Sequence, residues 1–205
     1  MTPSTPDPKN PENAAAGLIA RIRRSGAADA ALVSAADICV EDDLARHCRE
    51  PRCENYGRSP GCPPHVSGPA GFRRLLKGYH RALAVRIDVP TRILLAPERR
   101  DVLALLHDIV ADAERAAVGM GFANARAFAG GACKRLFCRD HAECRVLASG
   151  GTCRHPDRAR PSMSGFGINV SQLMKAAGWQ GEYLDPNAPA ENSGMSWIAG
   201  LILLD

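Results

Sequence analysis

Hydrophobic positions recur along the chain at two spacings, and these predict alternating helices and strands. Residues 81–89 place Leu83, Val85, Ile87 and Val89 at every second position, which indicates a half-buried strand. The apolar run over 197–204 is typical of a strand buried on both faces. Three segments repeat apolar residues every three or four positions, as helices with one buried face do: 12–24, 67–79 and 97–119.

Local signals complete the expected order. Weak patterns predict strands over 30–40 and 122–128, and residues 183–195 predict a loop rich in Pro and Asn. Asn169 with Gln172 three residues later is typical of a helix start, and Gly178 fits the end of that helix. The resulting order is helix, strand, Cys-rich loop, helix, strand, helix, strand, Cys-rich loop, helix, strand. It predicts an α/β or α+β fold with a single mixed sheet flanked by helices.

Length and composition limit the domain organisation and the class of protein. The 205 residues (21.9 kDa) fit one domain over 12–205, after a disordered Pro-rich tail over 1–11. The net charge of +4 and the aromatic content of 5% argue against nucleic-acid binding. No apolar run reaches the roughly 18 residues of a membrane span, and the N-terminus lacks a signal-peptide pattern. We therefore expect a cytoplasmic protein without a membrane or nucleic-acid partner.

The eight cysteines fall into two segments, 39–65 and 130–165, that form the long loops of the predicted fold. Disulfides are rare in the cytosol, so clustered thiols there indicate metal binding or redox chemistry. Iron–sulfur clusters use four Cys thiolates at varied spacing, whereas structural zinc usually takes pairs of short Cys hooks. The gaps here, of four residues or more, favour iron–sulfur and leave zinc and free redox thiols open. The first set is Cys48, Cys53 and Cys62 with Cys39 as a candidate fourth member, and the second is Cys133, Cys138, Cys144 and Cys153.

Basic side chains surround the second set of cysteines. Residues 133–160 contain seven basic and three acidic residues. Nearby cations lower the pKa of a thiol and offset the negative charge of a thiolate cluster. We expect this local charge to favour thiolate ligands.

Two motifs resemble a known family. Residues 53–57 (CENYG) lead to 61–64 (GCPP), and residues 153–156 (CRHP) lead through 159–163 (ARPSM) to 167–170 (GINV). Together these motifs are similar to a hallmark of the predicted metal-binding proteins called domain of unknown function 2284. The resemblance extends from about residue 30 to the C-terminus. It implies a bound metal, with iron–sulfur as the expected form, and does not imply a reaction.

Our leading hypothesis is a cytosolic iron–sulfur protein of the 4Fe–4S type, acting in electron transfer or redox chemistry with a redox partner protein. The four-Cys set would form a complete site that relays electrons. The first set would leave one ligand position to Cys39, His65, solvent or substrate, and would carry any chemistry. His65, Arg160 and Ser162 are candidate cofactor-binding residues. Neutralisation of the cluster and turn capping would explain Arg160 and Ser162 equally, and a His after Cys-Pro-Pro more often only hydrogen-bonds within its loop. Cys39 has a plain alternative as a small buried hydrophobic residue.

Two further functions remain open from the sequence. One is a zinc-stabilised structural or adaptor module without catalysis, and the other is a metal or cluster carrier. The sequence assigns neither a reaction nor an oligomeric state.

Overall fold

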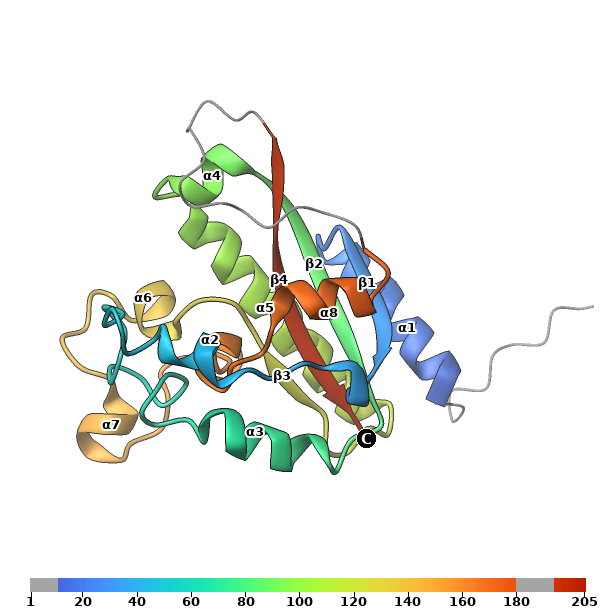
Figure 1. Ribbon diagram of the computed structural model, residues 1–205, viewed down its shortest axis with the longest axis horizontal. Coiled ribbons are helices and arrows are strands. Elements are labelled where there is room, and N and C mark those ends of the chain that lie inside the picture. The colour runs from blue at the N-terminus through green and yellow to red at the C-terminus, as the bar shows by residue number, and fades with distance from the viewer. Residues whose placement is uncertain (1–10, 180–193) are drawn as a thin grey trace, which may run out of the picture.

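A four-stranded sheet in the order β1-β2-β4-β3 forms the middle layer of the protein (Figure 1). The structure is a computed structural model that describes residues 11–179 and 194–205. Every pair of neighbouring strands is antiparallel. The strands are β1 (Asp29–Ser34), β2 (Arg81–Pro90), β3 (Arg126–Phe128) and β4 (Met195–Leu204).

Helices cover both faces of this sheet. On one face pack α1 (Pro11–Arg24) and α5 (Arg99–Gly119). On the other face pack α3 (Gly68–Leu76), the short 3-10 helix η2 (Met163–Phe166) and α8 (Val170–Ala176). The remaining elements are short: η1 (Ala35–Asp37), α2 (Asp42–Arg46), α4 (Thr91–Leu95), α6 (Cys133–Phe137) and α7 (Arg145–Ser149).

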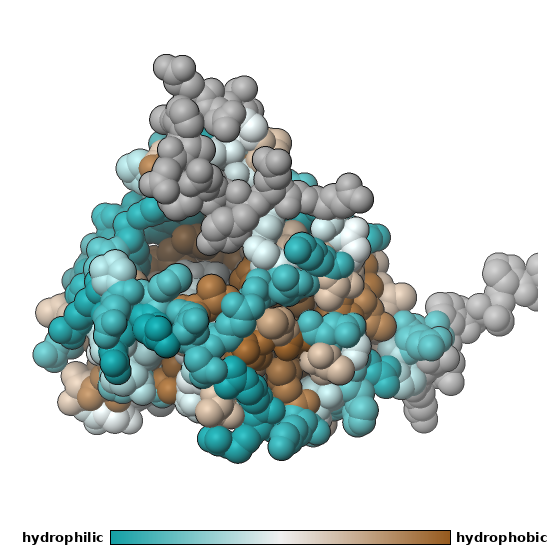
Figure 2. Space-filling model, viewed as in Figure 1, coloured by the Kyte–Doolittle hydropathy of each residue, from teal (hydrophilic) through white to brown (hydrophobic). Residues whose placement is uncertain are grey.

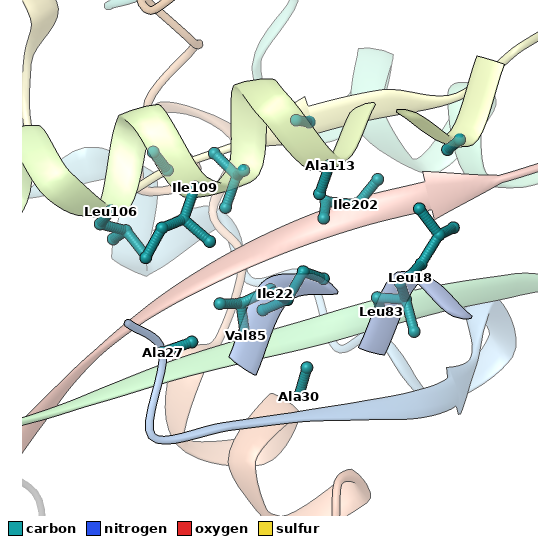
Figure 3. Packing of buried hydrophobic residues seen from close by; sticks show 14 of the residues in the cluster. Leu18, Ile22, Ala27, Ala30, Leu83, Val85, Leu106, Ile109, Ala113 and Ile202 are labelled. Carbon is teal, nitrogen blue, oxygen red and sulfur yellow. The ribbon is translucent and has the colours of Figure 1, made fainter. Parts of the chain in front are cut away.

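The central strands β2 and β4 are apolar on both sides because each side meets a helix layer. Toward α1 and α5, Leu83 and Ile202 pack against Leu18, Leu106 and Ile109 (Figure 3). This layer removes a large apolar area from water, which is the main favourable contribution to folding.

The opposite side of the sheet is held by three aromatic rings. Phe72, Phe128 and Phe166 contact one another with ring centroids 5.2–5.3 Å apart. Ala82 and Ala84 of β2 are fully buried in this second cluster. The prediction of a half-buried β2 was therefore wrong, because the alternating alanines are small apolar residues that pack under the helix layer instead of facing solvent.

The predicted order of elements and the single sheet flanked by helices are confirmed. The pairing is antiparallel throughout instead of mixed, which places the fold in the α+β class. Asn169 accepts a hydrogen bond from the backbone N–H of Gln172 at 3.0 Å, as its spacing predicted. The helices α2, α6 and α7 inside the cysteine loops were not predicted, since five residues are too few to show a helical period.

Two expectations fall mostly outside the described residues. The predicted tail over 1–11 shares only Pro11 with them, and this residue begins α1. The predicted loop over 183–195 shares only Gly194 and Met195. Within the described ranges, no helix combines the length and the hydrophobicity that crossing a membrane requires.

Gly200 lies where α5 crosses β4 most closely, and we predict that Gly200→Ala destabilises the protein. An added Cβ would lie 2.5 Å from Val110 Cγ1 and 3.3 Å from the carbonyl oxygen of Phe128. Overpacking of this kind costs about 1–3 kcal/mol. Urea unfolding should show that loss. The control Gly119→Ala meets open space at the end of α5 and should leave stability equal or slightly higher; equal stability of the two variants would contradict the close crossing.

Candidate metal centre

The cysteine segments lie side by side to one side of the sheet, around α2, α6 and α7 (left in Figure 1). Three thiols, those of Cys48, Cys53 and Cys62, line a cleft of about 980 Å³. Four others line a smaller cavity of about 220 Å³, and they belong to Cys133, Cys138, Cys144 and Cys153. All of these cysteines are free thiols. The two groups in space match the two groups that the spacing suggested.

Cys39 lies apart from both groups. It lines neither the cleft nor the smaller cavity. Its sulfur donates to Glu41 Oε1 at 3.5 Å, and burial together with this carboxylate raises the pKa of its thiol. A higher pKa disfavours the thiolate that a metal requires. The surroundings of Cys39 thus agree with its plain interpretation as a half-buried small residue.

The cleft and the smaller cavity adjoin at a wall where Cys62 lines the cleft, Cys133 lines the cavity, and Ser59 lies beside both thiols. Ser59 is 1% exposed, and its hydroxyl makes no regular hydrogen bond in the described structure. It nevertheless lies close enough to both neighbouring thiols to lower their pKa values, against the burial that raises them. A buried hydroxyl without a partner is costly, and two thiolates beside it would supply acceptors. Ser59 therefore fits a site in which Cys62 and Cys133 are deprotonated.

Burial dominates the electrostatics of the thiols. It raises the pKa of Cys133 to about 11 and also raises the pKa values of Cys48, Cys62 and Cys138. Neighbouring thiols raise them further, because several thiolates in one place repel one another. These four thiols are therefore stable as neutral groups, or as thiolates around a metal cation.

The expectation that the local basic residues lower the thiol pKa values was wrong for Cys133 and Cys138, whose pKa values are raised. Arg154 and Lys134 oppose the rise at Cys138 only in part. The other basic side chains are held elsewhere: Arg135 pairs with Glu54, Arg139 with Asp140, Arg158 with Asp108, and Arg160 with Glu114. The sequence shows how many basic side chains are near the cysteines. The ion pairs with carboxylates determine how those side chains are oriented.

Residues 161–169 connect the two cysteine segments through the backbone. Ser162 N–H donates to the carbonyl of Gly61 at 2.9 Å, one residue before Cys62. Glu41 N–H donates to the carbonyl of Gly167 at 2.7 Å, near the other end of the first segment. Gly167 has φ +72°, and a Cβ there would lie 2.2 Å from the Glu41 carbonyl oxygen. Only glycine permits this close approach.

Side chains of helix α5 hold the C-terminal part of the second segment through ion pairs and a hydrogen bond. Arg158 makes a two-pronged ion pair with Asp108 at 2.6 and 2.7 Å. Arg160 Nε donates to Glu114 at 2.7 Å, in a pair whose side chains are only 10% and 20% exposed. His107 is fully buried, and its Nδ1 accepts the backbone N–H of Arg160 at 3.1 Å. These contacts come from one face of a helix that the sequence marked only as packing.

Inside the second segment, polar side chains hold the loop backbone around the thiols. The ammonium group of Lys134, which is 3% exposed, donates to the carbonyls of Cys138 (2.7 Å) and His141. Arg145 Nε donates to the carbonyl of Thr152 at 2.7 Å. The backbone N–H of His155 points at the Cys153 sulfur, 3.3 Å away. Amide donors to sulfur are a feature of iron–sulfur sites, where they tune the reduction potential.

The candidate cofactor-binding residues have different surroundings. Ser162 lines the cleft and is 8% exposed. Arg160 lines the smaller cavity, but its guanidinium is occupied by Glu114 and by the carbonyls of Pro156 and Ala159. His65 is exposed, lines neither space and pairs with the Gly57 carbonyl at 3.3 Å. Their roles in binding stay predictions.

Sequence reasoning missed several residues of this site. His47, Arg99 and Arg100 also line the cleft, and no motif or spacing marked them. Ser59 was likewise unmarked, since its importance comes from burial beside a thiol of the other segment, and Lys134 was counted only as one of seven local cations.

The donor set fits a thiophilic metal group, because seven thiols, a buried hydroxyl and an amide donor to sulfur converge on two adjoining spaces. In the described part of the chain, no three Cys, His, Asp or Glu side chains already stand as the ligands of one metal ion. The thiols thus line the same two spaces, but no three of the described ones are placed to bind a single metal ion.

Comparison with known proteins agrees with a metal-binding role. A family model described as predicted metal-binding protein (DUF2284) matches residues 31–204. No curated protein and no solved structure matches the chain.

Buried His107 should make the stability of the fold depend on pH. Burial lowers its pKa from 6.5 to about 4, so the folded state binds its proton less readily than the unfolded state. Its contribution is complete above pH 6.5, falls between pH 6.5 and 4, and amounts to about 3 kcal/mol. Urea unfolding at several pH values should show a shallower decline for His107→Gln in this window, and parallel curves would contradict a neutral buried ring.

Proposed function

The chain belongs to the family of predicted metal-binding proteins that its residues 31–204 match, and from this premise we propose that it is a cytosolic iron–sulfur protein acting in electron transfer or redox chemistry. One observation carries the proposal: seven free thiols from two distant segments collect in two adjoining spaces, four in one and three in the other. Free thiols in this number agree with a reducing compartment.

The four-thiol cavity would hold a complete cluster. Cys133, Cys138, Cys144 and Cys153 line a space of about 220 Å³, which is smaller than a typical cavity for an organic ligand. When bound, an iron–sulfur cluster accepts and donates single electrons and, where an iron lacks a thiolate, offers a Lewis-acid position. Here the protein supplies four sulfur ligands, the amide donor of His155 and the buried charge of Lys134 to offset thiolate charge.

The three-thiol group opens onto a much larger cleft. Neither Cys39 nor His65 lines that cleft, although the backbone N–H of His65 donates to the carbonyl of Cys62 at 3.0 Å. The exposed His47 does line it, next to Cys48 in the chain. A fourth position that faces a cleft of about 980 Å³ is accessible to solvent or to a substrate. We therefore assign any chemistry to this group.

The shared wall supports an exchange of electrons between the two groups. Cys62 of the first group lies near Cys133 of the second, and electrostatic repulsion from its thiolate contributes to the raised pKa of Cys133. The four-thiol site would then supply electrons to the three-thiol site, and a redox partner protein would supply the four-thiol site.

The spread of the sulfurs favours a group of several metal atoms over a single zinc ion. Ligand sulfurs around one tetrahedral zinc lie ~3.8 Å apart, given Zn–S bonds of about 2.3 Å. Among the described residues, no three ligands stand together in the manner of one bound ion. A larger inorganic core needs its sulfurs farther apart, as gathered but separated thiols allow.

Analysis of iron, acid-labile sulfide and zinc in anaerobically purified protein tests the proposal. We predict a brown protein in which iron and sulfide are stoichiometric. Cys144→Ser should remove the metal of the four-thiol site and leave part of the total, and Cys53→Ser should do the same for the three-thiol site. Each variant removes one of the thiols that line its cavity.

Cys39→Ser is the matched control, because Cys39 lines neither space, and it should retain the full metal content. A colourless protein that carries zinc without sulfide would identify the zinc-stabilised module instead. Unchanged metal in Cys144→Ser would contradict two separate sites.

A further inference from the structure

In the cleft beside the three-thiol group, Arg99 and Arg100 carry positive charge that no described residue of the wall balances. Arg99, Arg100 and Arg135 line it, and so does His47. Within the described residues, no aspartate or glutamate lines this cleft. We propose that the cleft binds a small organic oxyanion, a carboxylate or a phosphate, with Arg99 and Arg100 as its main contacts. The inference deepens the proposed function by naming the substrate class of the three-thiol site.

Arg99 and Arg100 are set apart from the other arginines near the cysteines. Both are half-buried in the first turn of α5. Over residues 11–179 and 194–205, neither guanidinium has an ion pair or a hydrogen bond, whereas Arg135 across the cleft is held by Glu54. A half-buried guanidinium without a partner loses hydration and gains nothing in return. Its planar donors match the two oxygens of a carboxylate or phosphate.

The position of these arginines on α5 adds a second source of positive potential. Helix α5 has 21 residues, and Pro97 and Leu103 line the cleft together with the two arginines, so the N-terminal end of the helix borders the cleft. The partial positive charge of a helix N-terminus favours an anion in the same place as the guanidinium groups do.

The rest of the wall indicates an organic body attached to the anionic group. Leu44, Leu103 and Ile168 give apolar surface, and Asn55 and Ser162 give neutral polar groups. Figure 2 shows hydrophobic surface inside a recess on this side of the molecule, with hydrophilic residues around it. The volume of about 980 Å³ is at the upper end of the range for small-molecule sites. A ligand anchored at α5 would extend toward the thiols of Cys48 and Cys53, which line the same cleft.

Calorimetric titration of the full chain in chloride buffer tests this site with three probes: inorganic phosphate, inorganic pyrophosphate and succinate. We expect saturable binding of at least one probe, weakened at least tenfold in Arg99→Gln/Arg100→Gln, because two charge-assisted contacts are removed. Preference for pyrophosphate would assign a phosphate ligand, and preference for succinate a carboxylate.

The control is Arg24→Gln/Arg74→Gln, which removes the same charge from two exposed arginines outside the cleft and should bind as the wild type does. Failure of all three probes to bind, or equal loss in both double variants, would overturn the proposal. If the first double variant fails to fold, the single variants Arg99→Gln and Arg100→Gln replace it, each with a several-fold loss expected. Metal content is measured in every variant, so loss of the cluster and loss of the anion are separate outcomes.

Discussion

The backbone pairing of residues 161–169 with both ends of the first cysteine segment is the constraint on which the site depends. Ser162 N–H donates to the Gly61 carbonyl and Glu41 N–H donates to the Gly167 carbonyl, so one short stretch holds two points of the first segment that are twenty residues apart in the chain. The same stretch also continues the sheet edge, where Ala129 and Ser162 form a parallel bridge. Main-chain hydrogen bonds therefore fix the position of the thiol-bearing loop relative to the core, and these bonds do not depend on a bound group.

Desolvation decides how these thiols behave. Four of them have pKa values raised chiefly by burial, although many arginines are nearby. Most of those arginines neutralise carboxylates on α5 or within the loops, and so they position the chain instead of activating sulfur. A metal cation is the group that could stabilise several thiolates at once in such surroundings. The proposed cluster sites follow from this balance between burial and uncompensated negative charge.

The two cavities differ in a way that separates their proposed roles. The smaller one is lined by four thiols and by residues that fix the loop backbone, whereas the larger one combines three thiols with apolar surface and two guanidinium groups, of Arg99 and Arg100, that pair with no other described residue. Arg99 and Arg100 belong to α5, the helix that also holds the second cysteine segment through Asp108 and Glu114. One rigid helix thus connects the anion-binding end of the cleft to the support of the four-thiol cavity.

The sequence by itself determined the order of elements, the burial of β4, the start of α8 at Asn169 and the division of the cysteines into two groups. These features depend on local periodicity and spacing, which a chain carries without its partners. Only the tertiary structure decided that β2 is buried on both faces, that Cys39 and His65 do not line the cleft, and that Arg99 and Arg100 do. Each of these depends on contacts between residues far apart in the chain, and hydrophobic periodicity does not encode which loop meets which helix.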